Sequence, residues 1–182
     1  MYNLSTPYLY PYFIDARMYT PYLYDLADTT PIYNWDLERA PIELKDYGKQ
    51  PYVVDINEAT KQNNNFRTAL WTGTHLQVTL MSINVGDDIG LESHPNVDQF
   101  LRIEEGEGLV RMGMRKDNLN FERRVSDDYA IMIPAGTWHN VINTGNTPLK
   151  LYSIYAPPEH PFGTVHKTKA DAEAAEHGHR YY

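Results

Sequence analysis

The chain has no cysteine among its 182 residues. Disulfide bonds and thiolate zinc sites are therefore both excluded, and any metal must be bound by histidine, carboxylate or amide side chains. The absence of cysteine also fits a protein that resides in the cytoplasm, which is the location we expect. A coat-like assembly is the alternative.

Basic residues are scarce, with 16 Lys and Arg against 24 Asp and Glu and a net charge of −8. Nucleic acids and anionic membranes attract clustered Lys and Arg, so we expect neither as a partner. An acidic protein can still bind an acidic substrate where a metal cancels the local field.

Long apolar runs are missing too. None approaches the ~18–20 residues that a membrane-spanning helix requires. The N-terminus lacks a basic start followed by an apolar core, so no secretory signal is expected.

Tyrosine and proline, in contrast, are concentrated in the first 52 residues, which hold ten of the 15 Tyr and six of the 12 Pro. The string Thr-Pro-Tyr-Leu-Tyr begins at Thr6 and again at Thr20. Proline at this spacing prevents long helices and central strands. We predict an extended arm whose rings lie on the rest of the protein or on a neighbouring subunit. A partly disordered tail is the alternative.

The middle of the chain has the pattern of an all-β protein. From Leu76 apolar and polar residues alternate, as in a half-buried strand. Turn residues such as Asp127 and Gly145 separate the later candidates. Seven or eight short strands without a long helix between them predict a sandwich or barrel. The further predicted strands are 98–104, 108–114, 119–126, 129–133, 138–143 and 149–156.

Two short helices are expected outside these strands. The first covers residues 55–62 and ends at the Asn63-Asn64-Asn65 run. The second is the Ala-rich run 168–176, where Thr168 is a plausible N-cap and Asp171 completes a capping box. The predicted organisation is therefore an arm over 1–52, a barrel over 53–166, and a short helix with a tail over 167–182.

Four residues of the predicted barrel are candidate metal ligands: Glu92, His94, Gln99 and His139. Glu92 and His94 are two residues apart, so in a strand both side chains face the same way. Gln99 begins the next strand, and His139 comes from a strand about 40 residues further on. A carboxylate, two imidazoles and an amide oxygen suit one divalent ion of iron, manganese, nickel, cobalt or zinc.

The first of the two stretches that carry these ligands resembles the first motif of the cupin superfamily. That motif runs Gly, five residues, His-x-His, three or four residues, Glu, six residues, Gly. Here the same intervals separate Gly86, Glu92, His94, Gln99 and Gly106. Glu92 stands in place of the first family histidine, and Gln99 in place of the family glutamate.

The second stretch is similar to the second cupin motif, in which Pro-x-Gly is followed two residues later by His and three residues after that by Asn. Pro134, Gly136, His139 and Asn143 keep these positions, and Asp128 stands where the family prefers Gly. The resemblance covers about residues 70–157. It implies a jelly-roll β-barrel, commonly a homodimer or a higher homo-oligomer.

The local strings around residues 98–108 and 143–152 resemble single-domain cupins that are often labelled mannose-6-phosphate isomerase-like. We predict a metal-dependent enzyme of isomerase or tautomerase type with a small polar ligand, such as a sugar or keto acid. Glu92 would be the catalytic base where it is loosely bound. An Fe(II) dioxygenase is the rival chemistry, and a non-enzymatic structural or coat-type protein is the alternative outside enzymes.

Three further residues carry expectations about the barrel mouth. His160 and His166 flank a Pro-Phe-Gly turn that could fold over the mouth, where they stabilise a loop or, less often, touch a substrate. Trp138 adjoins His139 and should point away from the metal because neighbours in a strand alternate.

Overall fold

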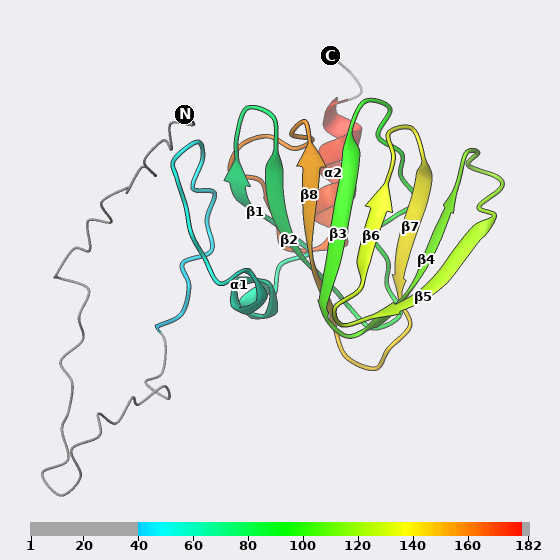
Figure 1. Ribbon diagram of the computed structural model, residues 1–182, viewed down its shortest axis with the longest axis horizontal. Helices are drawn as coiled ribbons and strands as arrows, with labels where there is room; N and C mark the ends of the chain where they lie inside the picture. Colours follow the sequence, from blue (N-terminus) through cyan, green and yellow to red (C-terminus); the bar gives the residue numbers. More distant parts are fainter. Residues whose placement is uncertain (1–39, 180–182) are drawn as a thin grey trace, which may run out of the picture. The chain divides into compact units, whose positions relative to one another are not determined.

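The computed structural model describes residues 40–179 of the chain (Figure 1). Most of the predicted arm, residues 1–39, lies outside the described residues. The elements in chain order are α1 (Ile56–Gln62), β1 (Arg67–Thr72), β2 (Gln77–Ile83), β3 (Asp98–Glu105), β4 (Glu107–Gly113), β5 (Phe121–Ser126), β6 (Ala130–Ile133), β7 (Trp138–Asn143), β8 (Leu149–Ala156), β9 (Val165–His166) and α2 (Lys169–His179).

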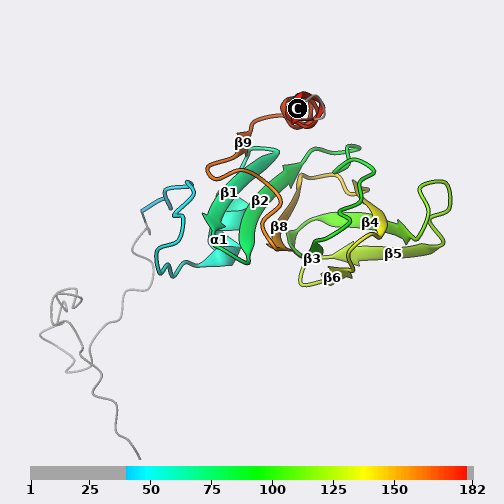
Figure 2. The same cartoon turned by 90° about the horizontal axis from the view of Figure 1, so that it is seen from above.

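The strands form two antiparallel sheets. One sheet has six strands in the order β6-β3-β8-β2-β1-β9, and the other has three in the order β5-β4-β7. Figure 2 shows the two sheets as walls on either side of the barrel interior. The described part of the chain is therefore the predicted all-β jelly-roll barrel with a short C-terminal helix.

The main core lies between the two sheets. Leu101 on β3 and Leu151 on β8 come from the larger sheet, and Val110 on β4 and Val141 on β7 come from the smaller one. All four are at most 1% exposed. These positions alternate with outward-facing residues, and that alternation is the pattern that predicted the strands.

A second apolar cluster covers the outer face of the larger sheet. Leu70 on β1, Leu80 on β2 and Ala59 on α1 are each at most 1% exposed. Four side chains from residues 42–54 pack against them. The outer face is therefore buried under α1 and the segment that precedes it. The packing residues from that segment are Ile42, Leu44, Tyr52 and Val54.

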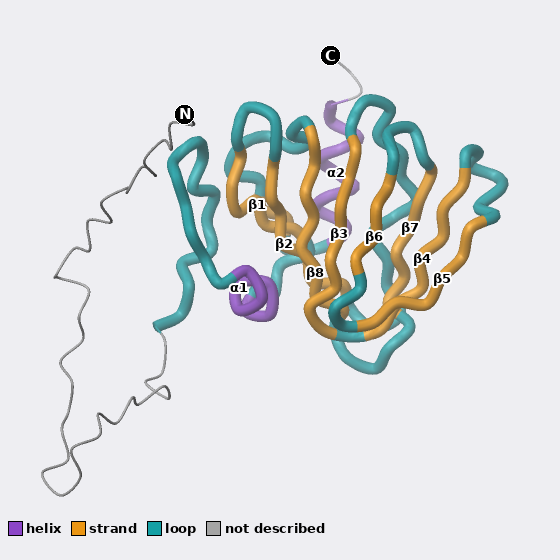
Figure 3. The backbone as a smooth tube through the Cα atoms, in the orientation of Figure 1, coloured by secondary structure: helices purple, strands orange, loops and turns teal. Residues whose placement is uncertain are grey.

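Both predicted helices are confirmed (Figure 3). The Asp55 carboxylate accepts a hydrogen bond from the Glu58 amide at the start of α1, and Asn63 ends that helix. Before α2, the Thr168 amide donates to Asp171 Oδ2 at 2.9 Å, and the Asp171 amide donates to Thr168 Oγ1 at 3.2 Å. This reciprocal pair is the capping box that the sequence predicts.

The outer edge of β1 is covered by two separate segments of chain. The Tyr47 amide donates to the Leu70 carbonyl at 2.9 Å, and the Ala69 amide donates to the Thr164 carbonyl at 2.8 Å. The Trp71 indole also donates to the Gln50 carbonyl at 2.8 Å. Segments that lie more than 100 residues apart in sequence thus meet along this one strand.

Neither helix within residues 40–179 combines the length and the apolar character that a membrane span requires.

Candidate metal centre

The backbone brings two of the candidate ligands into register. The Glu92 amide donates to the His139 carbonyl at 3.1 Å, and the His139 amide donates to the Glu92 carbonyl at 2.9 Å. His139 lies on β7, whereas Glu92 belongs to the β2–β3 connection and forms only this isolated bridge. The expected strand at Glu92 and His94 is therefore reduced to one bridged pair, which still directs both side chains to the same place.

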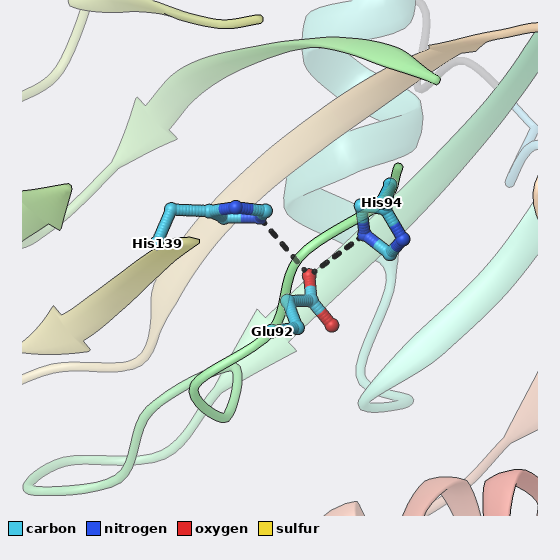
Figure 4. Close-up of side chains that lie close together, drawn as sticks. All are labelled: Glu92, His94 and His139. Atoms are coloured by element: carbon cyan, nitrogen blue, oxygen red, sulfur yellow. Dashed lines mark ion pairs between the residues drawn. The ribbon is translucent and has the colours of Figure 1, made fainter. Parts of the chain in front are cut away.

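The side chains of Glu92, His94 and His139 meet at one point. Glu92 Oε1 lies 3.4 Å from His94 Nε2 and 3.3 Å from His139 Nε2. Figure 4 shows both imidazoles directed at this same carboxylate oxygen. The three ligand atoms lie within 4.8 Å of one another, so the group could hold a metal ion.

The other ring nitrogens of the two histidines are already engaged. His139 Nδ1 lies 2.9 Å from the Thr137 carbonyl, and His94 Nδ1 lies 3.1 Å from Glu159 Oε1. Both Nε2 atoms are buried without a hydrogen-bond partner among the described residues. A histidine that binds a metal commonly has one nitrogen held by a carbonyl or carboxylate and the other free for the ion. The donor set therefore fits a divalent metal.

Gln99 is buried on the inner face of β3, with 3% of its surface exposed. Its Nε2 donates to Ser153 Oγ at 3.0 Å, which orients the amide. Its Oε1 is buried without a partner in residues 40–179. That oxygen is the atom that would serve as the fourth ligand, so the role of Gln99 stays a prediction.

The charges around these residues reinforce one another. Burial opposes ionisation of Glu92, but the nearby imidazoles of His139 and His94 and the positive charge of Arg67 outweigh it and lower the pKa of the carboxyl. Burial likewise opposes protonation of His94, but Glu159 and Glu92 raise its pKa to about 9. The centre thus stabilises a cation beside a carboxylate, and a metal would replace the proton.

The cupin domain family matches residues 79–155, the stretch that contains all four candidate ligands. The protein YrkC of Bacillus subtilis is 78% identical over 133 residues, which cover 73% of this chain and 72% of that one. This chain is a cupin.

Two further proteins are similar to this cupin. A protein of Acanthamoeba polyphaga mimivirus is 43% identical over 117 residues, covering 64% of this cupin and 71% of the relative. A crystal structure of a Bacillus halodurans protein has 72% identity and a TM-score of 0.71, and covers 71% of this chain and 98% of that one. The predicted family is confirmed, whereas the finer mannose-6-phosphate isomerase-like label is not.

The centre of this cupin opens into a cavity of about 710 Å³. Glu92 and His94 line it, and so do both His160 and His166. Trp138 lines it as well, and whether its ring points away from the metal, as the sequence predicts, stays a prediction. Trp138 is the first residue of β7, where the neighbouring loop folds beside the strand and brings Lys116 Nζ 5.3 Å from the ring.

Three functional candidates were not foreseen from the motifs. Glu159 lies in the loop after β8 and reaches back to His94. Arg67 lies on β1, is 1% exposed and lines the cavity. Tyr155 on β8 is fully buried with its ring 5.7 Å from that of His94, and burial raises its pKa to about 12. Tyr155 alone had a signal, since strand alternation allows at most one of Tyr152 and Tyr155 to lie inside the barrel.

Proposed function

We propose that this cupin is a metal-dependent enzyme of isomerase or tautomerase type that acts on a small polar substrate. One observation carries the proposal. Two free imidazole nitrogens and a carboxylate oxygen converge at the wall of a cavity of about 710 Å³. Cavities of this size are typical of small-molecule sites.

The candidate ligands have distinct expected roles in binding the metal. His94, His139 and Glu92 would hold the ion, with Gln99 as the predicted fourth ligand. A bound divalent metal would supply a Lewis acid that polarises a substrate carbonyl. Because the pKa of Glu92 is lowered, its carboxylate is a weak base, which favours its role as a ligand over its predicted role as the catalytic base.

An Fe(II) oxygenase is the second candidate, and the composition of the triad favours it. Two histidines and one carboxylate with open positions are the ligand set of non-haem Fe(II) oxygenases. The three candidate ligands here have the same composition.

The identity of the bound metal, together with oxygen uptake, distinguishes the isomerase from the oxygenase. Protein purified without chelator should hold close to one equivalent of divalent metal, measured by elemental analysis, and should consume no oxygen with candidate sugar or keto acids. Tightly held iron together with substrate-dependent oxygen uptake would overturn the isomerase proposal and support the oxygenase.

The ligand assignment has its own test. The double variant His94→Ala and His139→Ala should lose stoichiometric metal, because it removes both nitrogens that face Glu92 Oε1. His75→Ala, at an exposed histidine in the β1–β2 turn, is the matched control and should keep its metal. Metal retained at full stoichiometry by the double variant would refute the site.

A structural, coat-type role depends on the Tyr- and Pro-rich segment before residue 40, which lies outside the described residues. That role, assembly as a homodimer or higher homo-oligomer, and residence in the cytoplasm all stay predictions.

A further inference from the structure

The cavity contains a second group of polar side chains besides the candidate ligands. Arg67, His160 and His166 all line it. We propose that these three residues form an oxyanion subsite for the carboxylate or phosphate of a small substrate whose other oxygens reach the metal. The inference rests on the proposed function, and it names the substrate class for that same site.

The fold places Arg67 and His166 together. The two residues are directly paired across β1 and β9, so their side chains leave the sheet on the same face. Arg67 also pairs with Met81 of the main core, which identifies that face as the inner one. A guanidinium on the inner face, only 1% exposed, presents fixed donors that match a carboxylate or phosphate.

His160 is held in place by its own backbone. Gln77 Nε2 donates to the His160 carbonyl and the His160 amide donates to Gln77 Oε1, both at 2.9 Å. Its ring lies 5.0 Å from that of Tyr155, edge to face. The imidazole is therefore positioned before any ligand arrives, which reduces the entropy lost on binding.

Both imidazoles have an unused nitrogen. His160 Nε2 and His166 Nδ1 are buried without a hydrogen-bond partner among the described residues. Buried polar atoms in native proteins are nearly always paired, so two such atoms on residues that line one cavity are consistent with a ligand that completes their hydrogen bonding. Burial and the charge of Arg67 lower the pKa of both rings, so they are neutral near pH 7 and can donate without adding charge.

The charge of the cavity also favours an anion. Once a metal replaces the proton of His94, the charged side chains of the lining are Arg67 and Lys116 on the positive side and Glu92 and Glu159 on the negative side. These charges balance, so a divalent ion would leave two positive charges uncompensated in a confined space. A negatively charged substrate restores the balance, whereas a neutral polyol does not.

Binding of three matched probes to the metal-loaded protein tests the subsite. Glycerate carries a carboxylate, glycerol 3-phosphate carries a phosphate, and glycerol has a similar carbon skeleton without charge. Both anions should bind at least tenfold more tightly than glycerol in a calorimetric titration, and the ratio between them shows which oxyanion the subsite prefers. Equal affinity for all three would overturn the proposal.

Substitutions test whether the subsite residues cause the preference for anions. Arg67→Gln should remove at least tenfold of the affinity for the preferred anion while leaving glycerol affinity and metal stoichiometry unchanged. Arg111→Gln, at an exposed arginine paired with Glu122, is the matched control and should change neither. If Arg67→Gln does not fold, His160→Gln combined with His166→Gln makes the same test, with His75→Gln as its control. A folded variant that keeps the full anion preference would refute the assignment.

Inorganic phosphate separates this inference from the proposed function. If the protein binds no metal, the enzyme proposal is overturned. Phosphate that still binds the metal-free protein, shifting the His160 and His166 imidazole resonances, would then support the subsite on its own. Metal binding without any anion preference would leave the proposed function standing and overturn the subsite.

Discussion

The Nδ1 atoms of His94 and His139 determine what their Nε2 atoms can bind. His139 Nδ1 is held by the backbone carbonyl of Thr137, and His94 Nδ1 is held by the Glu159 carboxylate. The carbonyl contact depends only on the main chain around Thr137. The carboxylate contact depends on a side chain that a single substitution can change.

Glu159→Gln should therefore weaken metal binding. Removing the partner of a metal-bound histidine typically lowers metal affinity by ~10–100-fold, because the ring loses its orientation and part of its basicity. Competition with a chromophoric chelator measures the affinity. Asp117→Asn, at an exposed carboxylate paired with Arg115, is the control. Unchanged affinity in Glu159→Gln would show that the contact does not support the site.

His160 should make stability depend on pH. Burial and the charge of Arg67 lower its pKa from 6.5 to about 3. Between these values the unfolded chain binds a proton that the folded chain does not, so acidification favours unfolding. The slope is about 1.4 kcal/mol per pH unit for one proton.

Urea titrations at pH 7, 5 and 4 measure this slope. The free energy of unfolding of the native protein should fall more steeply with acidification than that of His160→Gln. His75→Gln, which alters an exposed ring, should follow the native protein. Parallel slopes for the native protein and His160→Gln would contradict the prediction.

The sequence predicted the three candidate ligands that the fold brings together, but not the residues around them. Glu92, His94 and His139 lie in two motifs with fixed spacing, which is sufficient to propose them without a structure. Arg67 and Glu159 lie outside both motifs, and a charged residue is usually exposed. Only the folding of β1 and the β8–β9 loop onto the cavity reveals their positions.

At the scale of elements, the alternation of apolar and polar residues was sufficient to predict a strand wherever the alternation was unbroken. Strands β3, β4 and β8 lie close to their predicted ranges. β1 was not predicted because its register shifts between Ala69 and Trp71, which breaks the alternation, and because it begins with a buried arginine. β9 has two residues, which is too short for any periodic signal.

The cap of α1 offers a test at this scale. The carboxylate of Asp55 accepts the Glu58 amide, so Asp55→Ala should lower the free energy of unfolding by about 1 kcal/mol. Urea denaturation measures the change. Glu122→Ala, which removes an exposed ion pair with Arg111, should change stability by less than about 0.5 kcal/mol. Equal effects of the two substitutions would show that the cap adds nothing.

At the scale of the whole molecule, residues 40–54 belong to the packing of the barrel. Ile42, Leu44, Tyr52 and Val54 contact the cluster on the outer face of the larger sheet. A chain that lacks residues 1–54 should be less stable by several kcal/mol than one that lacks residues 1–39, because four apolar side chains are partly buried there and full burial of one contributes about 1.5–3 kcal/mol. Thermal unfolding of the two chains measures the difference.

The chain that lacks residues 1–39 also tests the predicted arm. The mass of the chain lacking residues 1–39, compared with that of the full chain by light scattering, reports whether the Tyr- and Pro-rich segment is needed for assembly. An unchanged oligomer would remove the coat-type role from consideration. Equal thermal stability of the two truncated chains would contradict the packing role of residues 40–54.

The covered edge of β1 limits how two copies can join. An exposed strand edge is a template on which another chain can add a strand, leading to fibres or continuous intermolecular sheets. Here Tyr47 and Thr164 already occupy hydrogen-bonding groups of that edge. Tyr47 comes from the segment before β1, and Thr164 comes from the segment after β8. A homodimer of this protein is therefore expected to form through side-chain faces and not by extending the larger sheet past β1. Loss of the segment around Tyr47 would increase the tendency to aggregate before it altered the chemistry of the cavity.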